Sequence, residues 1–472
     1  AQLALYPCSG SCVITDVKTG ELLALVSYPG YDNNRLANTV DADYFASLNT
    51  DLSKPLYNYA TQERTAPGST FKMVSSVAGL DTGVITLTTQ IMDKGVYENI
   101  SNHPRCWALN HGYTHGLINV SEALRDSCNY FFYDVGYRLA TNNFSTSYDD
   151  ATGISKIQEY ASLLGLDETT GVEIEENDPQ IADEYPVMAA IGQSNNNYAT
   201  IQLGRYVSAI ANDGNVYEYT LLSKVCDSDG NTLETYEPKV RNTVDVLDTT
   251  QWNAIHTGMR MVVENLSTFD NFPIEVAGKT GTTDAYNDLW FVGYTPYYTC
   301  AVWGGYDDNK ECDYDTSFRF RLWKGIMSRI HENLESKDFK VPTSVEKKSI
   351  CTITGKLATN GCPSITEYFA KDTLPSETCS GHGYSSGRKY KSSTEDNDTT
   401  KDASSYSNNT GNSYNNNTGT TSDNTGGNTG GSTGGNTGDS TGGNTGGSTG
   451  GNTGGGSTGG NTGGSTDGDT SQ

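Results

Sequence analysis

Apolar and polar positions follow two different periods along this chain. Residues 10–28 alternate in the manner of two strands, separated by a polar turn at Lys18, Thr19 and Gly20. Glycine suits this turn because it adopts a positive φ without strain. Further on, apolar residues recur at helical spacing. The segments with this spacing are 71–80, about 121–139, 200–211 and 250–264.

The strand period returns in the second half of the chain. It covers residues 274–283, 289–294 and 298–306, the last two joined by a short turn at Thr295 and Pro296. Strands at both ends with helices between them predict an α+β fold. We expect the two terminal strand groups to share one antiparallel β-sheet, flanked by helices and interrupted by a mostly helical inserted region.

Composition changes sharply near the C-terminus. Residues 401–472 hold 23 of the 52 glycines, repeat Gly-Gly-Asn-Thr-Gly and Gly-Gly-Ser-Thr-Gly, and lack the apolar residues that a core needs. Such a segment is typical of a flexible coil. We therefore divide the chain into a domain at 1–340, a small cysteine-containing extension at 341–390 and a disordered Gly/Asn/Thr/Ser-rich tail at 391–472.

The net charge is −26, from 31 basic and 57 acidic residues. The tail from residue 401 holds one lysine and five aspartates, a charge of −4, so the remainder carries −26 − (−4) = −22. This acidity disfavours nucleic acid as a partner. The sequence contains no run of about 18 apolar residues that could span a bilayer. Because a strand pattern begins near residue 10, we expect a preceding N-terminal portion that carries any anchor.

Ten cysteines are spread along the chain without a C-x-x-C pair. The one notable grouping is Cys351, Cys362, Cys379 and His382. Its spacing matches no standard zinc module, so we favour a disulfide or free thiols over a metal site. His111 and His115 have the i, i+4 spacing of a metal pair, but neighbouring glycines favour a structural loop. We expect neither a metal nor a cofactor in this protein.

Ser69 and Lys72 form an S-x-x-K motif at the start of the first apolar helix. At i and i+3 the two side chains share a face, so the lysine amine can reach the serine oxygen. The helix N-terminus directs N–H groups at the same place. Burial would lower the pKa of this lysine towards that of a working base. A second S-x-x-K, Ser344 to Lys347, precedes no apolar helix.

Two further motifs offer groups for catalysis. Ser127 and Asn129 present a hydroxyl and an amide at i and i+2, a pair that can relay a proton and hold a substrate amide. Lys279-Thr280-Gly281-Thr282 lies in a predicted strand, where the lysine and hydroxyls suit a carboxylate and glycine permits close approach of a ligand backbone. Similar triplets at 194–196 and 18–20 lack such a setting.

In this order the S-x-x-K, S-x-N and K-T-G motifs form the signature of penicillin-binding proteins and class A β-lactamases. The chain resembles the transpeptidase domain of a class B penicillin-binding protein over about residues 10–335, in the clostridial type that serves cell elongation and shape or division. The resemblance also extends beyond the motif residues themselves. It covers 19–34, 64–72 around the S-x-x-K motif, 190–193 and 210–214, whereas Ala199-Thr200 replaces the family's usual Thr-Pro.

The resemblance implies a role for each motif residue. Ser69 would attack the D-Ala–D-Ala carbonyl and Lys72 would accept its proton. Ser127 would pass a proton to the leaving D-alanine, while Asn129 would bind the donor peptide amide and orient Lys72. Lys279, also catalytic, would set the electrostatics and, with Thr280 and Thr282, engage the terminal carboxylate. Thr280, Gly281 and Thr282 would form the substrate-binding strand. The backbone N–H groups of Ser69 and Thr282 would form the oxyanion hole.

The same resemblance implies peptidoglycan stem peptides ending in D-Ala–D-Ala as substrates, β-lactams as acylating inhibitors, and a penicillin-binding transpeptidase fold related to serine β-lactamases. It also implies membrane-bound cell-wall synthesis machinery as partner and the extracytoplasmic face of the cell membrane as location. Residues 350–382 are similar to extensions that follow clostridial penicillin-binding domains. Two alternatives remain open: a β-lactamase or D,D-carboxypeptidase, and a non-catalytic β-lactam sensor.

Overall fold

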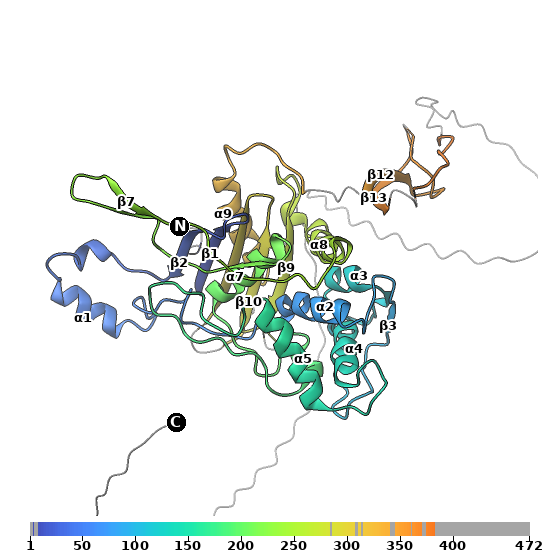
Figure 1. Ribbon diagram of the computed structural model, residues 1–472, viewed down its shortest axis with the longest axis horizontal. Helices are drawn as coiled ribbons and strands as arrows, with labels where there is room; N and C mark the ends of the chain where they lie inside the picture. Colours follow the sequence, from blue (N-terminus) through green and yellow to red (C-terminus); the bar gives the residue numbers. More distant parts are fainter. Residues whose placement is uncertain are drawn as a thin grey trace, which may run out of the picture. The chain divides into compact units, whose positions relative to one another are not determined.

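The computed structural model describes residue 3 and residues 8–283, 286–306, 310–312, 315–339, 345–359, 361–370 and 374–382. At its centre is a five-stranded antiparallel sheet with strand order β2-β1-β11-β10-β9 (Figure 1). The strands are β1 (Ser9–Asp16), β2 (Leu22–Tyr28), β9 (Ala277–Thr282), β10 (Asp288–Tyr294) and β11 (Tyr298–Gly305). The predicted α+β class and the antiparallel sheet are therefore confirmed.

Both ends of the domain meet in this sheet. Strand β1 pairs with β11 along its whole length, from Ser9 opposite Gly305 to Asp16 opposite Tyr298. The predicted hairpin is present, and Gly20 has a φ of 68° in its turn. Sequence-distant strands thus lie side by side, and β9, which carries the K-T-G motif, becomes the sheet edge.

Helices cover both faces of the sheet. In β10, Trp290, Val292 and Tyr294 belong to the core beneath α7 (Thr200–Ala211) and the helical region, whereas Leu289 and Phe291 belong to the core beneath α9. Helix α9 spans Phe318–Ile330. All seven β10 residues are buried, because alternate side chains face two apolar layers.

The inserted region is mostly helical, as predicted (Figure 1). Its helices are α1 (Ala42–Thr50), α2 (Lys72–Asp81), α3 (Val120–Arg125), α4 (Asn129–Ala140), α5 (Asp150–Leu163), α6 (Pro186–Ala189) and α8 (Thr249–Glu264). Short 3₁₀ turns occupy Asn33–Arg35, Gly68–Phe71, Trp107–His111 and Ser267–Phe269. Helix α2 is buried from Lys72 to Leu80 and forms the centre of this region.

The helical pattern at 121–139 is divided between two helices. Helix α3 ends at Arg125 and α4 begins at Asn129, so Ser127 lies in a loop and Asn129 at a helix start. Ser127 interrupts the helix with a φ of 50°, outside helical backbone space. The apolar positions keep helical spacing on both sides, so periodicity alone does not reveal the break.

The described residues also form four two-stranded sheets. They pair β3 (Ile91–Asp93) with β4 (Gly116–Ile118), β5 (Asn215–Tyr217) with β8 (Val240–Thr243), β6 (Lys224–Cys226) with β7 (Thr232–Thr235), and β12 (Val345–Cys351) with β13 (Ser364–Ala370). The predicted tail lies outside the described residues.

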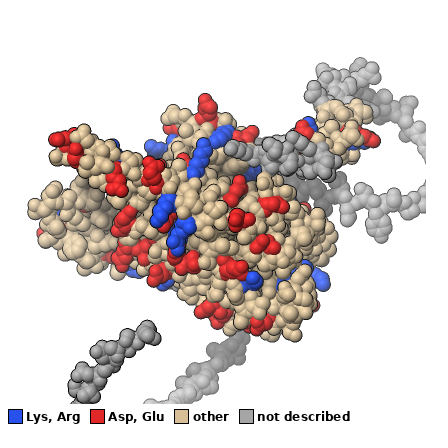
Figure 2. All heavy atoms as spheres, in the orientation of Figure 1, with Lys and Arg blue, Asp and Glu red and all other residues tan. Residues whose placement is uncertain are grey.

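Two observations concern the surface and the membrane. Acidic side chains are spread over the visible face, whereas several of the fewer basic ones form a narrow band and others lie apart from it (Figure 2). Within the described ranges, no helix combines the length and the apolarity required to cross a bilayer.

Candidate active site

Ser69 lies in the 3₁₀ turn that leads into α2, at the edge of the central sheet. The residue before it, Gly68, has a φ of 51°, and a Cβ at that position would lie 2.6 Å from the Thr282 carbonyl oxygen and 3.0 Å from the Thr282 nitrogen. The turn and the end of β9 are therefore in direct backbone contact, which only glycine permits. Ser69 itself is half-buried and borders this contact.

Lys72 is fully buried under the serine turn. Its ammonium donates to Asn129 Oδ1 at 2.6 Å, to the Ser127 carbonyl oxygen at 2.8 Å and to Ser127 Oγ at 3.3 Å. Burial lowers the pKa of Lys72 to about 8, because the charged form loses its hydration. A buried lysine with oriented partners and a lowered pKa is suited to accept a proton near neutral pH.

Ser127 connects this lysine to the sheet. Lys279 donates to Ser127 Oγ at 2.9 Å and also contacts the Thr280 carbonyl oxygen at 3.2 Å and the Thr280 hydroxyl at 3.3 Å. Lys279 is fully buried, and its pKa is held well below its usual value by desolvation and by the neighbouring cations Lys72 and Arg319. The hydroxyl of Ser127 thus receives hydrogen bonds from two buried amines.

The structure brings all the predicted site residues to the junction of α2, the α3–α4 loop and β9. Lys72 and Lys279 are buried. Most of the other site residues are half-buried and therefore accessible to a solute. The half-buried residues are Ser69, Ser127, Asn129, Thr280 and Thr282; Gly281 is buried between the last two. This arrangement offers a nucleophile and hydrogen-bonding groups above two cations.

Arg319 and Trp107 support the site and were not identified from the sequence. The Arg319 guanidinium, on α9, donates to the Gly281 carbonyl oxygen at 2.8 Å and to Thr282 Oγ1 at 2.9 Å. The Trp107 indole donates to the Ser127 carbonyl oxygen at 3.0 Å and so helps to hold the strained serine. Neither residue lies in a motif, and only the folded chain brings them to the site.

The second copies of the motifs are elsewhere. Asn196 is buried and binds the backbone of Ala182, and Lys18 lies in the β1–β2 turn. Ser344 lies outside the described residues.

Four further side chains behind the site could hold a metal ion. Asp93, Cys106, His115 and Cys128 each offer one ligand atom, and these atoms lie within 4.8 Å of one another. His115 Nδ1 is 2.8 Å from Asp93 Oδ2, and Cys128 stands between Ser127 and Asn129 in the chain. Two thiols, an imidazole and a carboxylate are donors suited to a cation such as Zn²⁺. His111, expected to be structural, does not belong to this cluster.

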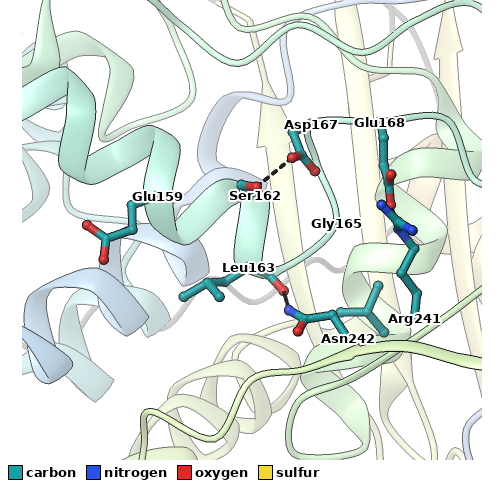
Figure 3. Close-up of a pocket in the computed structure, with 9 residues that line it drawn as sticks. Glu159, Ser162, Leu163, Gly165, Asp167, Glu168, Arg241 and Asn242 are labelled. Atoms are coloured by element: carbon teal, nitrogen blue, oxygen red, sulfur yellow. Dashed lines mark hydrogen bonds and ion pairs between the residues drawn. The ribbon is translucent and has the colours of Figure 1, made fainter. Parts of the chain in front are cut away.

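A cavity of about 510 Å³ lies away from the motifs, between α5, the loop that follows it, and the β5–β8 pair (Figure 3). The ion pair of Arg241 with Glu168 and the hydrogen bond from Asn242 to the Leu163 carbonyl oxygen lie on its wall. No residue of the three motifs lines it. The candidate site therefore remains at the motifs.

Comparison with known proteins gives matches over most of the chain. Residues 10–319 match the penicillin binding protein transpeptidase domain, and residues 341–384 match the C-terminal domain of penicillin-binding protein 1A. The peptidoglycan D,D-transpeptidase MrdA of Haemophilus influenzae is 27% identical over 332 residues, 61% of this chain and 48% of that protein. Penicillin-binding protein 1A of Clostridium botulinum (strain Langeland) is 29% identical over 391 residues, 79% of this chain and 42% of that protein.

The chain thus spans less than half the length of each of these relatives. Among solved structures, Pseudomonas aeruginosa PBP2 in complex with WCK 5153 has the same fold, with a TM-score of 0.59, 24% identity, and coverage of 71% of this chain and 76% of that one. The family model covers well over half of the sequence. The chain therefore belongs to the penicillin-binding protein transpeptidase domain family, as its three motifs indicate.

Proposed function

We propose that this chain is a peptidoglycan D,D-transpeptidase that joins stem peptides through an acyl-enzyme on Ser69 and is acylated there by β-lactams. The observation that carries the proposal is that Lys72 and Lys279 both donate to the Ser127 hydroxyl, while Lys72 also donates to Asn129, beside the turn that holds Ser69. The curated relatives named peptidoglycan D,D-transpeptidase support the reaction class.

In the first step the Ser69 oxygen forms a bond to the penultimate D-alanine carbonyl carbon. Lys72 takes the serine proton, and Asn129 holds the lysine in place and binds the peptide amide. Negative charge develops on the carbonyl oxygen, where the N–H groups of Ser69 and Thr282 would stabilise it. Such a donor contributes about 3 kcal/mol to lowering the barrier.

The tetrahedral intermediate then loses the terminal D-alanine. Ser127 gives its proton to the leaving nitrogen and is reprotonated from Lys72, so that the carbon–nitrogen bond breaks without expelling an anion. Lys279 favours the negatively charged carboxylate of the substrate, which Thr280 and Thr282 bind across Gly281. An amine from a neighbouring stem peptide attacks the ester carbonyl, forms the cross-link and restores the Ser69 hydroxyl.

We further propose that 1–340 is the catalytic domain, 341–390 a small cysteine-containing extension and 391–472 a disordered tail. The matches at 10–319 and 341–384 support the first two segments. The chain would act at the extracytoplasmic face of the cell membrane with cell-wall synthesis machinery, because peptidoglycan is assembled there. The name peptidoglycan D,D-transpeptidase of a curated relative supports a role in cell-wall synthesis.

The first test is labelling of the full chain with a fluorescent penicillin. We expect a covalent label that persists for hours, disappears in Ser69→Ala and is retained in Ser344→Ala, the matched serine of the second S-x-x-K. A label that survives Ser69→Ala, or no label on the folded chain, would overturn the assignment of the nucleophile.

A second assay separates the three readings of the site. The transpeptidase should exchange the terminal D-alanine of a D-Ala–D-Ala pentapeptide for a labelled D-amino acid. Rapid loss of the penicillin label, with hydrolysis in place of exchange, would indicate a hydrolase. A stable label with neither exchange nor cross-linking would indicate a sensor domain.

A further inference from the structure

Few buried apolar side chains occur among the described residues of the C-terminal extension. Strands β12 and β13 form a hairpin in which Cys351 stands opposite Ser364. Among the extension's described side chains, the buried apolar ones are Ile350, Cys351 and Cys379. A segment this short cannot offset its ordering entropy by burial alone and needs a covalent or metal cross-link.

Three cysteines and one histidine converge in this extension. They are Cys351, Cys362, Cys379 and His382, whose ligand atoms all lie within 4.8 Å of one another. The His382 Nε2 atom lies 2.9 Å from the Cys351 sulfur and 3.3 Å from the Cys379 sulfur. Cys351 and Cys379 are buried, and the other two are half-buried. One imidazole nitrogen therefore faces two thiols at the centre of the segment.

Tight turns hold the first of these side chains. The Gly355 N–H donates to the Cys351 carbonyl oxygen at 2.8 Å, and Gly355 has a φ of 70°. The nearby backbone amides of Ile353 and Thr354 favour the thiolate form of Cys351. Polar groups around a ligand of this kind help to orient it for metal binding.

A second turn holds the two ligands at the other end of the segment. Cys379 and His382 are three residues apart, and Gly381 between them has a φ of 89°. The Cys379 N–H donates to the Leu357 carbonyl oxygen at 2.8 Å, which ties this turn to the strand-like segment that follows Cys351. The Thr359 hydroxyl connects the second turn to Cys362. The hydroxyl donates to the Cys379 carbonyl oxygen at 3.2 Å, and its oxygen lies 3.4 Å from the Cys362 sulfur.

A metal ion accounts for this group better than a disulfide. A disulfide would use two sulfurs and leave a third thiol and an imidazole in the same place. In tetrahedral zinc sites, Zn–S is about 2.3 Å and Zn–N about 2.0–2.1 Å, which separates ligand atoms by roughly 3.4–3.8 Å. The observed separations require only small movements to reach that geometry. Sulfur and nitrogen donors also exclude magnesium and calcium as the natural ions.

We propose that Cys351, Cys362, Cys379 and His382 bind one Zn²⁺ ion that cross-links the C-terminal extension. The three cysteines bind as thiolates and release their protons to solvent, and His382 binds as neutral imidazole through Nε2; no redox change occurs. Four protein ligands leave no open position, so the site is structural. This proposal departs from the thiol or disulfide interpretation, because the spacing in sequence does not show that the four side chains meet.

The test measures zinc in the full chain, purified without added metal, by elemental analysis. The double variant Cys362→Ser/His382→Ala should lose about one zinc per chain relative to the parent. Cys226→Ser, which changes an exposed cysteine far from the cluster in sequence, should lose none. Cys106→Ser removes one ligand of the other cluster, formed by Asp93, Cys106, His115 and Cys128. Any zinc that this variant loses belongs to that cluster, so the zinc content of each cluster is measured separately.

A second readout uses Co²⁺ in place of zinc. The parent and Cys106→Ser should both show the thiolate-to-cobalt charge-transfer bands of a three-sulfur site, and the double variant should lose them. Limited proteolysis of the zinc-loaded chain should cleave within 345–382 only after chelation, while the penicillin label on Ser69 is unchanged. This pattern separates the metal site from the catalytic function.

Three outcomes would overturn the proposal. The first is an equal zinc content in the parent and the double variant. The second is a Cys351–Cys379 disulfide, found by peptide mass spectrometry in the chain as purified and alkylated. The third is reaction of all three cysteines with a thiol reagent at the same rate with and without saturating zinc.

Discussion

Lys279 donates a 2.9 Å hydrogen bond to the hydroxyl of Ser127 and thereby joins the edge strand β9 to the loop before α4. The same hydroxyl lies 3.3 Å from the ammonium of Lys72. Two buried cations that share one hydroxyl repel each other, which disfavours protonation of both at once. The three motifs thus act on one another through Ser127, although more than 200 residues separate the first from the last.

Lys72→Met should slow acylation strongly. The methionine retains much of the side-chain volume but cannot accept the Ser69 proton, and a positioned general base contributes about 10²- to 10⁴-fold. Pseudo-first-order labelling by a fluorescent penicillin gives the rate. Lys156→Met removes an exposed lysine of α5 that pairs with Glu159 and serves as the control. Equal rates for both variants would exclude Lys72 as the base.

The acylation rate should rise with pH through about 8. Burial lowers the pKa of Lys72 to about 8, so the fraction of neutral lysine, the form that accepts a proton, increases across this range. Labelling rates measured at constant ionic strength from about pH 6 to 9.5 test this profile. A rate that falls over the interval contradicts it.

Arg319→Ala should weaken both the fold and the site. The truncation removes two hydrogen bonds from a nearly buried guanidinium to Gly281 and Thr282, each worth about 1.5–3 kcal/mol when a charged group donates. Thermal denaturation and penicillin labelling should both report the loss. Arg321→Ala, on the same helix but in an exposed ion pair with Asp315, should cost no more than about 1 kcal/mol. Comparable losses in the two variants would count against this role for Arg319.

Gly192→Ala should disrupt the serine turn. Gly192 has a φ of 76°, and a Cβ there would lie 2.0 Å from the Gly68 carbonyl oxygen, a backbone atom that cannot move without displacing Ser69. We expect a destabilisation above about 4 kcal/mol or loss of folding, measured by denaturant unfolding. Gly83→Ala has the same backbone strain, with a φ of 70°, but no atom within 4 Å of the new Cβ.

The control variant should therefore lose only about 1–2 kcal/mol, the cost of the left-handed conformation, and keep its penicillin label. The difference between the two variants measures the contact between the Gly192 and Gly68 backbones. Similar stabilities would show that the serine turn tolerates displacement.

Much of the fold was accessible from periodicity. The pattern at 200–211 matches α7, and that at 250–264 differs from α8 by one residue, because an apolar face against a core leaves a regular signal. The break at Ser127 left no such signal, since a backbone φ is set by surroundings that include Trp107. The β12–β13 hairpin was not predicted, because its strands carry weak alternation of apolar and polar residues.

For the candidate site, the sequence determined the residue types, their local spacing and the family. It placed Ser69 before a helix and Lys279 in a strand because both settings depend on neighbours within a few residues. Only the tertiary structure decided that these elements meet at Ser127, that Arg319 supports β9 and that Cys351 lies beside His382. Those contacts join residues far apart in the chain, and they exist because the sheet and helices pack in one particular order, which local patterns do not encode.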